Sequence, residues 1–266
     1  MVVGIDGAFV KALPTRRSQR RQLEVITGRI ESAQHRGEAY AVVRDLDSLA
    51  KQRLRAILRQ CGRGPKTEIT VLSDGEDGLR GLVGSWFGKR CRPRLDWFHV
   101  ARRIERIRKG FLYLPYDQDF QQRIADHNAN LNSMKWMLWN DGVEMAEFGM
   151  TGVRIGLFQH ALSRPEADRQ RFLDLEDRLN ELRSYLYANR EATRGYAEAH
   201  RSGERVSTAH VESTVNQLIN WRMCKKKQMA WSRRGAQYLL HVKTAVLSGR
   251  LERYTGNYSK DQAIAA

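Results

Sequence analysis

Short apolar runs separated by turn residues dominate the first hundred residues. Residues 1–10, 22–30 and 39–44 are rich in strand-forming side chains, and together they predict an antiparallel meander. Residues 69–72 form an apolar run without alternation, which is typical of a strand buried on both faces. Apolar positions at helical spacing predict helices as well. The remaining predicted elements are helices over 47–61 and 76–87 and a fifth strand over 94–98. This order predicts an α/β fold, a mixed five-stranded sheet with helices packed on it.

From about residue 111 to residue 206 the pattern changes to helix alone. Apolar residues there repeat at steps of about 3.5 residues, which indicates the seam of an antiparallel helix pair; they are Phe172, Leu175, Leu179, Leu182 and Leu186. Further helices are expected from about Ala209 and Gly235. The prediction is therefore a discontinuous domain of residues 1–110 and 207–253, an all-helical insertion of residues 111–206, and a tail of residues 254–266.

Composition narrows the class of protein. Lys and Arg number 46 against 30 Asp and Glu, and the net charge of +16 argues for a polyanionic partner such as nucleic acid. The three cysteines are too widely spaced for a disulfide framework or a zinc finger. Neither a membrane span nor a signal peptide is recognisable, so we expect a cytoplasmic, nucleoid-associated protein without a membrane partner.

Three acidic residues stand out by position. Asp6 lies within the first strand, between Gly4 and Gly7, where a carboxylate is costly unless it is paired or bound to metal. Asp74 follows the buried strand at the edge where α/β sheets collect ligands. Glu212 flanks the apolar stripe of the helix that starts near Ala209. Each also has a purely structural interpretation. Asp6 would belong to a strand-end turn, Asp74 would be a helix cap or part of an Asp-Gly turn, and Glu212 would be a first-turn acid favoured by the helix dipole. Two strand-end carboxylates and a helical one can together hold two divalent ions for phosphoryl transfer.

A second group of residues surrounds the fifth predicted strand. Asp96 and His99 would flank its end, with His99 orienting a phosphate or a leaving group; the alternative is a capped helix start with Asp96 as the cap. The basic side chains that we expect to bind nucleic acid, with an aromatic that can stack on a base, are Arg102, Arg103, Arg106, Lys225, Lys226, Lys227, Trp231, Arg233 and Arg234. Trp136 and Trp139 form a ridge that is either core or a wedge for a flipped base.

These motifs resemble those of the DDE-class transposases of bacterial insertion sequences. The matching segments are Leu72-Ser-Asp-Gly-Glu76, Leu95-Asp-Trp-Phe-His-Val100 and Val211-Glu-Ser-Thr-Val-Asn216 through Trp231-Ser. The sequence is most similar to the ISKra-type group, and it is also similar to Mutator-like transposases, whose Asp-x-x-His motif corresponds to Asp96 and His99.

The resemblance implies an RNase H-like fold with Asp6, Asp74 and Glu212 as the catalytic triad, holding two Mg²⁺ or Mn²⁺ ions. It also implies His99 near the reaction, transposon ends and target DNA as partners, and assembly of copies in a synaptic complex. Such transposases carry an N-terminal DNA-binding segment before the first catalytic strand, so we expect a truncated copy. The alternatives are a catalytically silent DNA-binding remnant and a stand-alone RNase H-like nuclease.

Overall fold

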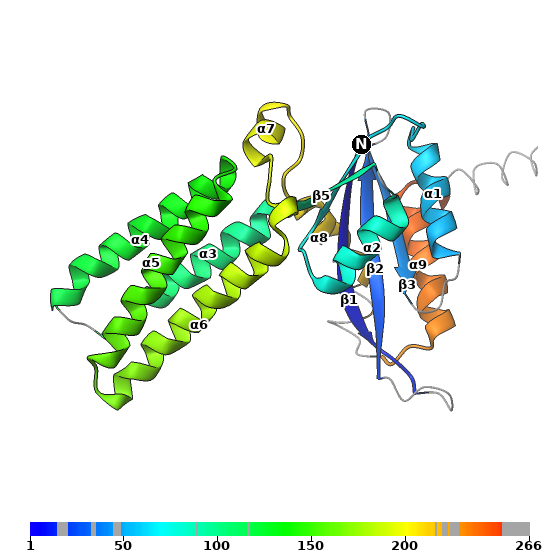
Figure 1. Cartoon of the computed structure of the whole chain (residues 1–266). Helices are drawn as coiled ribbons and strands as arrows, with labels where there is room; N and C mark the ends of the chain where they lie inside the picture. Colours follow the sequence, from blue (N-terminus) through cyan, green and yellow to red (C-terminus); the bar gives the residue numbers. More distant parts are fainter. Residues whose placement is uncertain are drawn as a thin grey trace, which may run out of the picture. The chain divides into compact units, whose positions relative to one another are not determined.

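The chain forms two compact units (Figure 1). Unit 1 comprises Met1–Pro93 and Thr208–Ala266, and unit 2 comprises Arg94–Ser207. This computed structural model describes residues 1–14, 21–32, 36–44, 49–88, 90–115, 118–215, 217–219, 223 and 229–251. Among them, no helix combines the length and the apolar character that crossing a membrane requires.

A mixed five-stranded sheet with the order β3-β2-β1-β4-β5 forms the centre of unit 1. Strand β1 pairs antiparallel with β2 and parallel with β4, and β3 pairs antiparallel with β2. The strands are β1 (Val2–Lys11), β2 (Gln22–Glu31), β3 (Arg36–Val43), β4 (Ile69–Ser73) and β5 (Cys91–Leu95). The predicted α/β fold, a mixed five-stranded sheet with flanking helices, is confirmed, and it is consistent with the RNase H-like fold that the resemblance implies.

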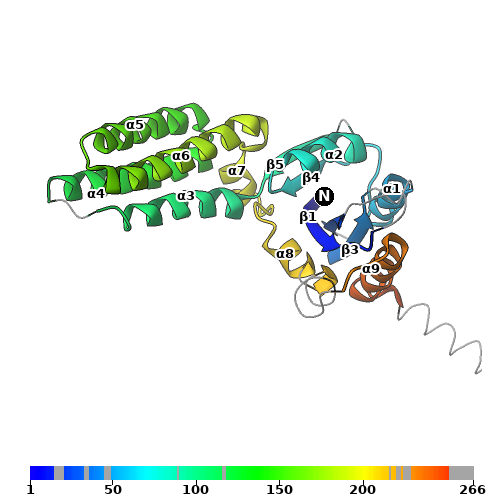
Figure 2. The same ribbon diagram turned by 90° about the horizontal axis from the view of Figure 1, so that it is seen from below.

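Helices cover both faces of this sheet (Figure 2). Helices α1 (Ala50–Gln60) and α2 (Asp77–Phe87) enclose one hydrophobic core with the side chains of Val3 and Ile5. Helices α8 (Ala209–Val215) and α9 (Arg233–Leu247) contribute to a second core on the opposite face, with Val10 and Ala12. Successive side chains of a strand point to opposite faces, so this division assigns each residue of the sheet to one core or the other.

Backbone N–H groups at the free edge of β3 donate hydrogen bonds to polar side chains near the C-terminal end of unit 1. The backbone N–H of Val43 donates to the Gln237 Oε1 atom at 2.7 Å, and the N–H of Ala39 donates to the Ser248 Oγ atom at 3.0 Å. An exposed strand edge is a template for unwanted pairing. Helix α9 and the residue after it therefore provide acceptors for two N–H groups at the edge of β3.

Unit 2 is a four-helix bundle followed by a short helical extension. Neighbouring helices in the chain are joined by short connections, and α3 and α5 each pack against α4 and α6. The predicted seam of α6 is confirmed, because its five apolar residues are all buried in the bundle core. The elements are α3 (Trp97–Phe111), α4 (Gln118–Trp139), α5 (Val143–Leu162), α6 (Glu166–Ala188), η1 (Arg190–Ala192) and α7 (Tyr196–Arg201).

Two boundaries differ from the sequence prediction. The fifth strand is Cys91–Leu95 rather than 94–98, because Asp96 starts α3 and residues 97 and 98 are its first turn. The helical unit begins at Arg94 rather than at residue 111. Helix α3 belongs to it because Val100, Ile104 and Ile107 are buried in the bundle core.

Candidate active site and nucleic-acid interface

Asp6 in β1 and Asp74 just after β4 have equivalent positions in the register of these two parallel strands. The β1–β4 ladder pairs Val2 with Thr70, Val3 with Val71, and Gly4 with Leu72. Two residues further along each chain lie Asp6 and Asp74. The two acids are therefore level with each other just past the last paired residues of the two strands.

Strand alternation assigns Asp6 to one face of the sheet. Val3 and Ile5 on β1, and Val71 on β4, belong to the core under α1 and α2. By the alternation of a strand, Asp6 projects to the opposite face, where α8 and α9 pack. Asp74 follows Ser73, the last residue of β4, so its direction is set by the turn that follows the strand and not by strand alternation.

The edge of β1 that pairs with β4 is open near Asp6. Strand β1 pairs with β2 along its whole length, from Val2 to Lys11, but with β4 only as far as Gly4. At the far end of this edge, Trp231 donates to the Lys11 carbonyl at 2.9 Å and accepts from the Leu13 N–H at 2.9 Å. Between these two contacts, no strand among the described residues pairs with this edge of β1. The opening lies at the carboxyl end of β4, where α/β sheets place their ligands.

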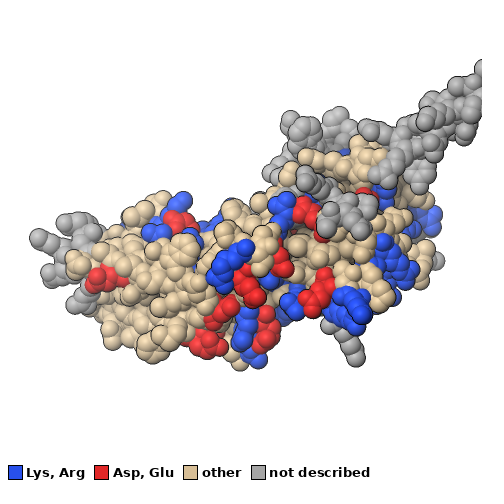
Figure 3. All heavy atoms as spheres, turned by 90° about the horizontal axis from the view of Figure 1, so that it is seen from above, with Lys and Arg blue, Asp and Glu red and all other residues tan. Residues whose placement is uncertain are grey.

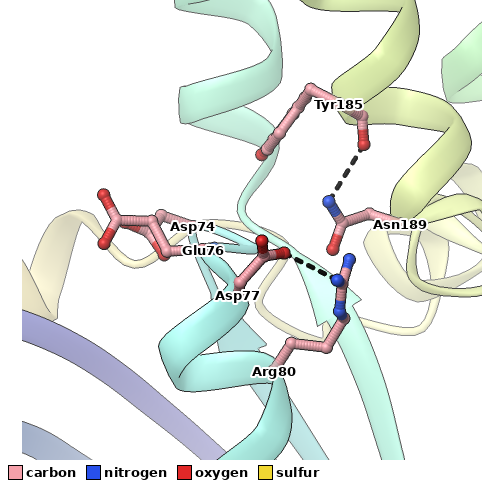
Figure 4. Close-up of polar contacts among 6 residues, drawn as sticks. All are labelled: Asp74, Glu76, Asp77, Arg80, Tyr185 and Asn189. Atoms are coloured by element: carbon pink, nitrogen blue, oxygen red, sulfur yellow. Dashed lines mark hydrogen bonds and ion pairs between the residues drawn. The ribbon is translucent and has the colours of Figure 1, made fainter.

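A tight turn holds the Asp74 carboxylate (Figure 4). Its Oδ1 atom accepts a hydrogen bond from the Glu76 N–H at 3.1 Å, and Gly75 between them has a φ of 76°, which favours glycine. Glu76, rather than Asp74, is the N-cap residue of α2. Nearby, Asp77 pairs with Arg80 at 2.6 Å on the first turn of that helix. Asp74 is thus a turn residue, as its structural interpretation predicted. The turn holds its carboxylate close to the end of β4.

Glu212 belongs to α8, the helix that packs against β1 and β2. Arg29 on β2 donates to the Thr214 hydroxyl at 3.4 Å, and Val211 is buried in the core of this face. The structure thus places the helix that carries Glu212 over the face to which Asp6 projects. The side chain of Glu212 lies outside the described residues. Among the described side chains, no group of three or more His, Cys, Asp or Glu could hold a metal ion.

Asp96 and His99 lie at the start of α3 in unit 2. The Asp96 carboxylate is fully buried and is the N-cap of α3, accepting from the Phe98 N–H at 2.8 Å. The His99 Nε2 atom is 3.9 Å from the Asp96 Oδ2 atom, and the imidazole is partly exposed. The capped helix start that the sequence left as an alternative is therefore present, while the role predicted for His99 stays a prediction.

The two tryptophans of the insertion differ in environment. Trp139 packs against Trp97 and Tyr196, with ring centroids 4.9 and 6.1 Å apart. Trp136 is 52% exposed, with Lys135 over its ring at 5.6 Å. Trp139 is thus part of the core of unit 2, and Trp136 is a surface residue.

The predicted DNA-binding residues fall into separate groups. Arg102, Arg103 and Arg106 are exposed on α3, and Arg103 lies over the Tyr185 ring at 4.2 Å. On the face drawn in Figure 3, basic groups alternate with acidic ones. The residues Lys225, Lys226 and Lys227 lie outside the described part of the chain.

The remaining predicted DNA-binding residues stand where α9 begins. Arg233 and Arg234 occupy its first turn, after the N-cap Ser232. Positive charge is disfavoured at a helix N-terminus. Trp231 is half-buried and packs against the core under α8 and α9. That packing gives its ring a structural role, and contact with a base stays a prediction.

Sequence reasoning missed one basic site. Arg55, Arg59 and Arg63 line a cavity of about 420 Å³ with Gly64 and Gly88, and none of the described residues that line it is acidic. Part of the signal was present in the sequence, because Arg55 and Arg59 are four residues apart and so share one side of α1. Arg63 lies beyond the end of this helix, and only the fold brings it to the other two.

The cysteines offer no nucleophile among the described residues. Burial raises the pKa of the Cys91 thiol to about 11, and burial, with the nearby Glu38, raises the pKa of Cys61. A thiol is nucleophilic only as the thiolate. Both cysteines are therefore inert at neutral pH.

The chain has distant structural similarity to the Drosophila P element transposase strand transfer complex. The two align with a TM-score of 0.40 and 11% sequence identity, and the alignment covers 92% of this chain and 76% of that chain. No family model and no curated protein matches the sequence.

Proposed function

We propose that unit 1 is the catalytic domain of a DNA transposase that cleaves and joins DNA strands with the help of divalent metal ions. The observation that carries the proposal is the register of β1 and β4, which brings Asp6 in β1 and Asp74 just after β4 to the same level at the open end of the sheet. Asp6 projects to the face of β1 on which α8 packs. The motifs add Glu212 as the third acid. The assignment to the ISKra-type group rests on those motifs.

The donor set suits Mg²⁺ or Mn²⁺, since hard cations prefer carboxylate oxygens. Asp6, Asp74 and Glu212 would hold two ions. Bound there, the ions would activate the attacking oxygen and stabilise the leaving oxygen of a phosphodiester. The chain's own residues supply the frame for this site. The Glu76 N–H orients the Asp74 carboxylate, and pairing with β2 fixes the backbone of Asp6.

The basic residues supply DNA affinity in this proposal. Phosphate contacts by Lys and Arg position DNA without reading its sequence. The groups on α3 and at the start of α9 are separate from the acids, so binding and cleavage should respond to different substitutions. Transposon ends and target DNA are the proposed partners, with several copies assembling in a synaptic complex.

The test is nicking of supercoiled plasmid DNA in Mg²⁺ or Mn²⁺ by Asp74→Asn, with Asp77→Asn as the matched control. The amide oxygen that the first substitution introduces can still accept the Glu76 N–H, so the turn survives while the charge is lost. Asp77 is a nearby exposed acid that pairs only locally with Arg80 among the described contacts. We expect Asp74→Asn to abolish nicking and to leave duplex DNA affinity within a few-fold, or to raise it. Asp77→Asn should nick normally.

Two outcomes would contradict the proposal. If the protein nicks equally well after neutralisation of Asp6, Asp74 or Glu212, the catalytic assignment is wrong. If the chain binds DNA but neither it nor a longer form with an N-terminal DNA-binding segment nicks, the chain is a DNA-binding remnant.

A further inference from the structure

Helix α5 is apolar on two opposite sides. One side, with Met150, Val153 and Leu157, is buried in the bundle core. The other side faces solvent, although it is also built of apolar residues. We call it the outer α5 stripe; it consists of Met145, Phe148, Gly152, Ile155, Phe158 and Leu162, and its five side chains are 60, 78, 53, 49 and 61% exposed.

The outer α5 stripe contains no charged residue. Charged residues make up 29% of the chain, and surface helices usually place them on the side away from the core. Between Met145 and Leu162, Gln159 is the only polar residue among the exposed positions of α5. Scattered exposed apolar residues need no explanation, but a contiguous apolar surface marks an interaction site.

Gly152 gives independent evidence for a partner. A glycine inside a helix is less favourable than an alanine, because it loses more conformational freedom on folding. Two other glycines of α5 are explained within the bundle, since a Cβ on Gly149 would lie 3.1 Å from Met134 and one on Gly156 would lie 2.9 Å from His127. A Cβ on Gly152 would meet nothing within 4 Å. Among the described residues, the glycine in the middle of the stripe thus has no such packing reason.

The area and spacing of the stripe fit a second copy of this chain. Its side chains are half to three-quarters exposed, and together they offer on the order of 500–600 Å² of apolar surface, given the area that such side chains bury. Two copies would cover about 1,000–1,200 Å², which reaches the lower range of specific interfaces. The apolar residues lie on both sides of Gly152 at similar distances along the helix, as a self-complementary contact requires.

We propose that the outer α5 stripe is a homodimer interface in which two α5 helices cross in antiparallel orientation at Gly152. The missing side chain lets the two backbones approach at the crossing point, as small residues do in closely packed helix pairs. Phe148 of one copy then packs beside Ile155 of the other, and Met145 beside Phe158. This interface is independent of the catalytic proposal, because it involves none of the acids in unit 1.

The experiment is sedimentation equilibrium of the whole chain over a range of micromolar concentrations, without DNA. We expect a reversible monomer–dimer equilibrium. Because each copy carries a net charge of +16, added salt screens the repulsion between copies. Raising the salt should therefore strengthen the dimer, whereas it weakens DNA binding.

Three variants make the test specific. Phe148→Asp should weaken the dimer at least ten-fold, because it buries a charge at the contact. Gly152→Leu should weaken it similarly while leaving the monomer's helical circular dichroism unchanged, because leucine is a better helix former than glycine. Tyr113→Asp is the matched control, since Tyr113 is 77% exposed but lies outside the stripe, and it should leave the dimer intact.

A chain that stays monomeric at every concentration would overturn the proposal, and would mean that another protein or another part of this chain covers the stripe. A dimer that tolerates Gly152→Leu would also overturn it. If Phe148→Asp fails to fold, Gly152→Leu alone decides.

Discussion

Replacement of Asp96 separates a structural from a catalytic role for the Asp-x-x-His motif. The carboxylate is fully buried, and its Oδ1 atom accepts the Phe98 N–H at 2.8 Å at the start of α3. Loss of an N-cap costs about 0.5–2 kcal/mol, and a buried N–H left without a partner costs about 1–3 kcal/mol. Both ranges estimate the cost of losing the same hydrogen bond, so they are not added. We therefore expect Asp96→Ala to lower the free energy of unfolding by about 2 kcal/mol.

The conservative variant should behave differently. Asp96→Asn keeps an oxygen that accepts the same N–H and loses only the charge, whose interaction with a helix N-terminus is worth about 0.3–1 kcal/mol. Its effect on stability should therefore stay within about 1 kcal/mol. If the motif is structural, Asp96→Asn also keeps DNA nicking at the wild-type rate.

The assay is urea unfolding followed by far-UV circular dichroism, in which the helices of unit 2 dominate. With a slope of about 2 kcal/mol per molar urea, Asp96→Ala should shift the midpoint by about 1 M. Glu144→Ala is the matched control, because Glu144 is a 79% exposed first-turn acid of α5, and it should shift the midpoint very little. A stable Asp96→Ala protein, or a stable Asp96→Asn protein that no longer nicks, would refute the structural interpretation.

Two further predictions concern the sheet edge and the DNA. Gln237→Ala should destabilise the protein by about 1–3 kcal/mol, because it leaves a buried N–H of β3 without its acceptor; thermal unfolding measures the loss, and an unchanged midpoint would contradict it. Replacing Arg102, Arg103 and Arg106 together by alanine should weaken duplex DNA binding. If each arginine contacts one phosphate, the slope of log affinity against log salt should become less steep by about 3. Fluorescence anisotropy at several salt concentrations measures this slope, and an unchanged slope would show that they do not contact phosphates.

The layered fold could be predicted from the sequence because its strands are marked by local patterns. The fifth strand was displaced in the prediction because Cys91-Arg-Pro-Arg94 has neither alternation nor a continuous apolar run. It lies at the edge of the sheet, where polar residues and proline are tolerated. Local pattern alone could not distinguish this strand from a loop.

The division between the units was harder to predict for a different reason. The apolar stripe of α3 is the same whether it packs on a sheet or in a bundle, and only the tertiary contacts decide. Likewise, the absence of charge on one side of α5 is visible in the sequence, but its meaning depends on which side the bundle buries. The periodicity of a helix shows which of its sides are apolar, but it does not show which element packs against each side.

The candidate site depends on sheet register more than on motif spacing. A motif places Asp6 in a strand and Asp74 after one, but Asp6 would point to the other face if its strand slipped by one residue. The structure sets them level because β1 and β4 pair in parallel only as far as Gly4 and Leu72, after which β4 turns towards α2 while β1 continues beside β2. The divergence that ends the ladder is also what opens the edge of β1 next to both acids.

A ligand at this point would meet two carboxylates whose positions are held by the sheet. The third acid is on α8, the helix that packs over β1 and β2. Two of the three proposed metal ligands therefore depend on the sheet alone, whereas the third depends on how α8 docks, and destabilising α8 should impair cleavage before it unfolds the sheet.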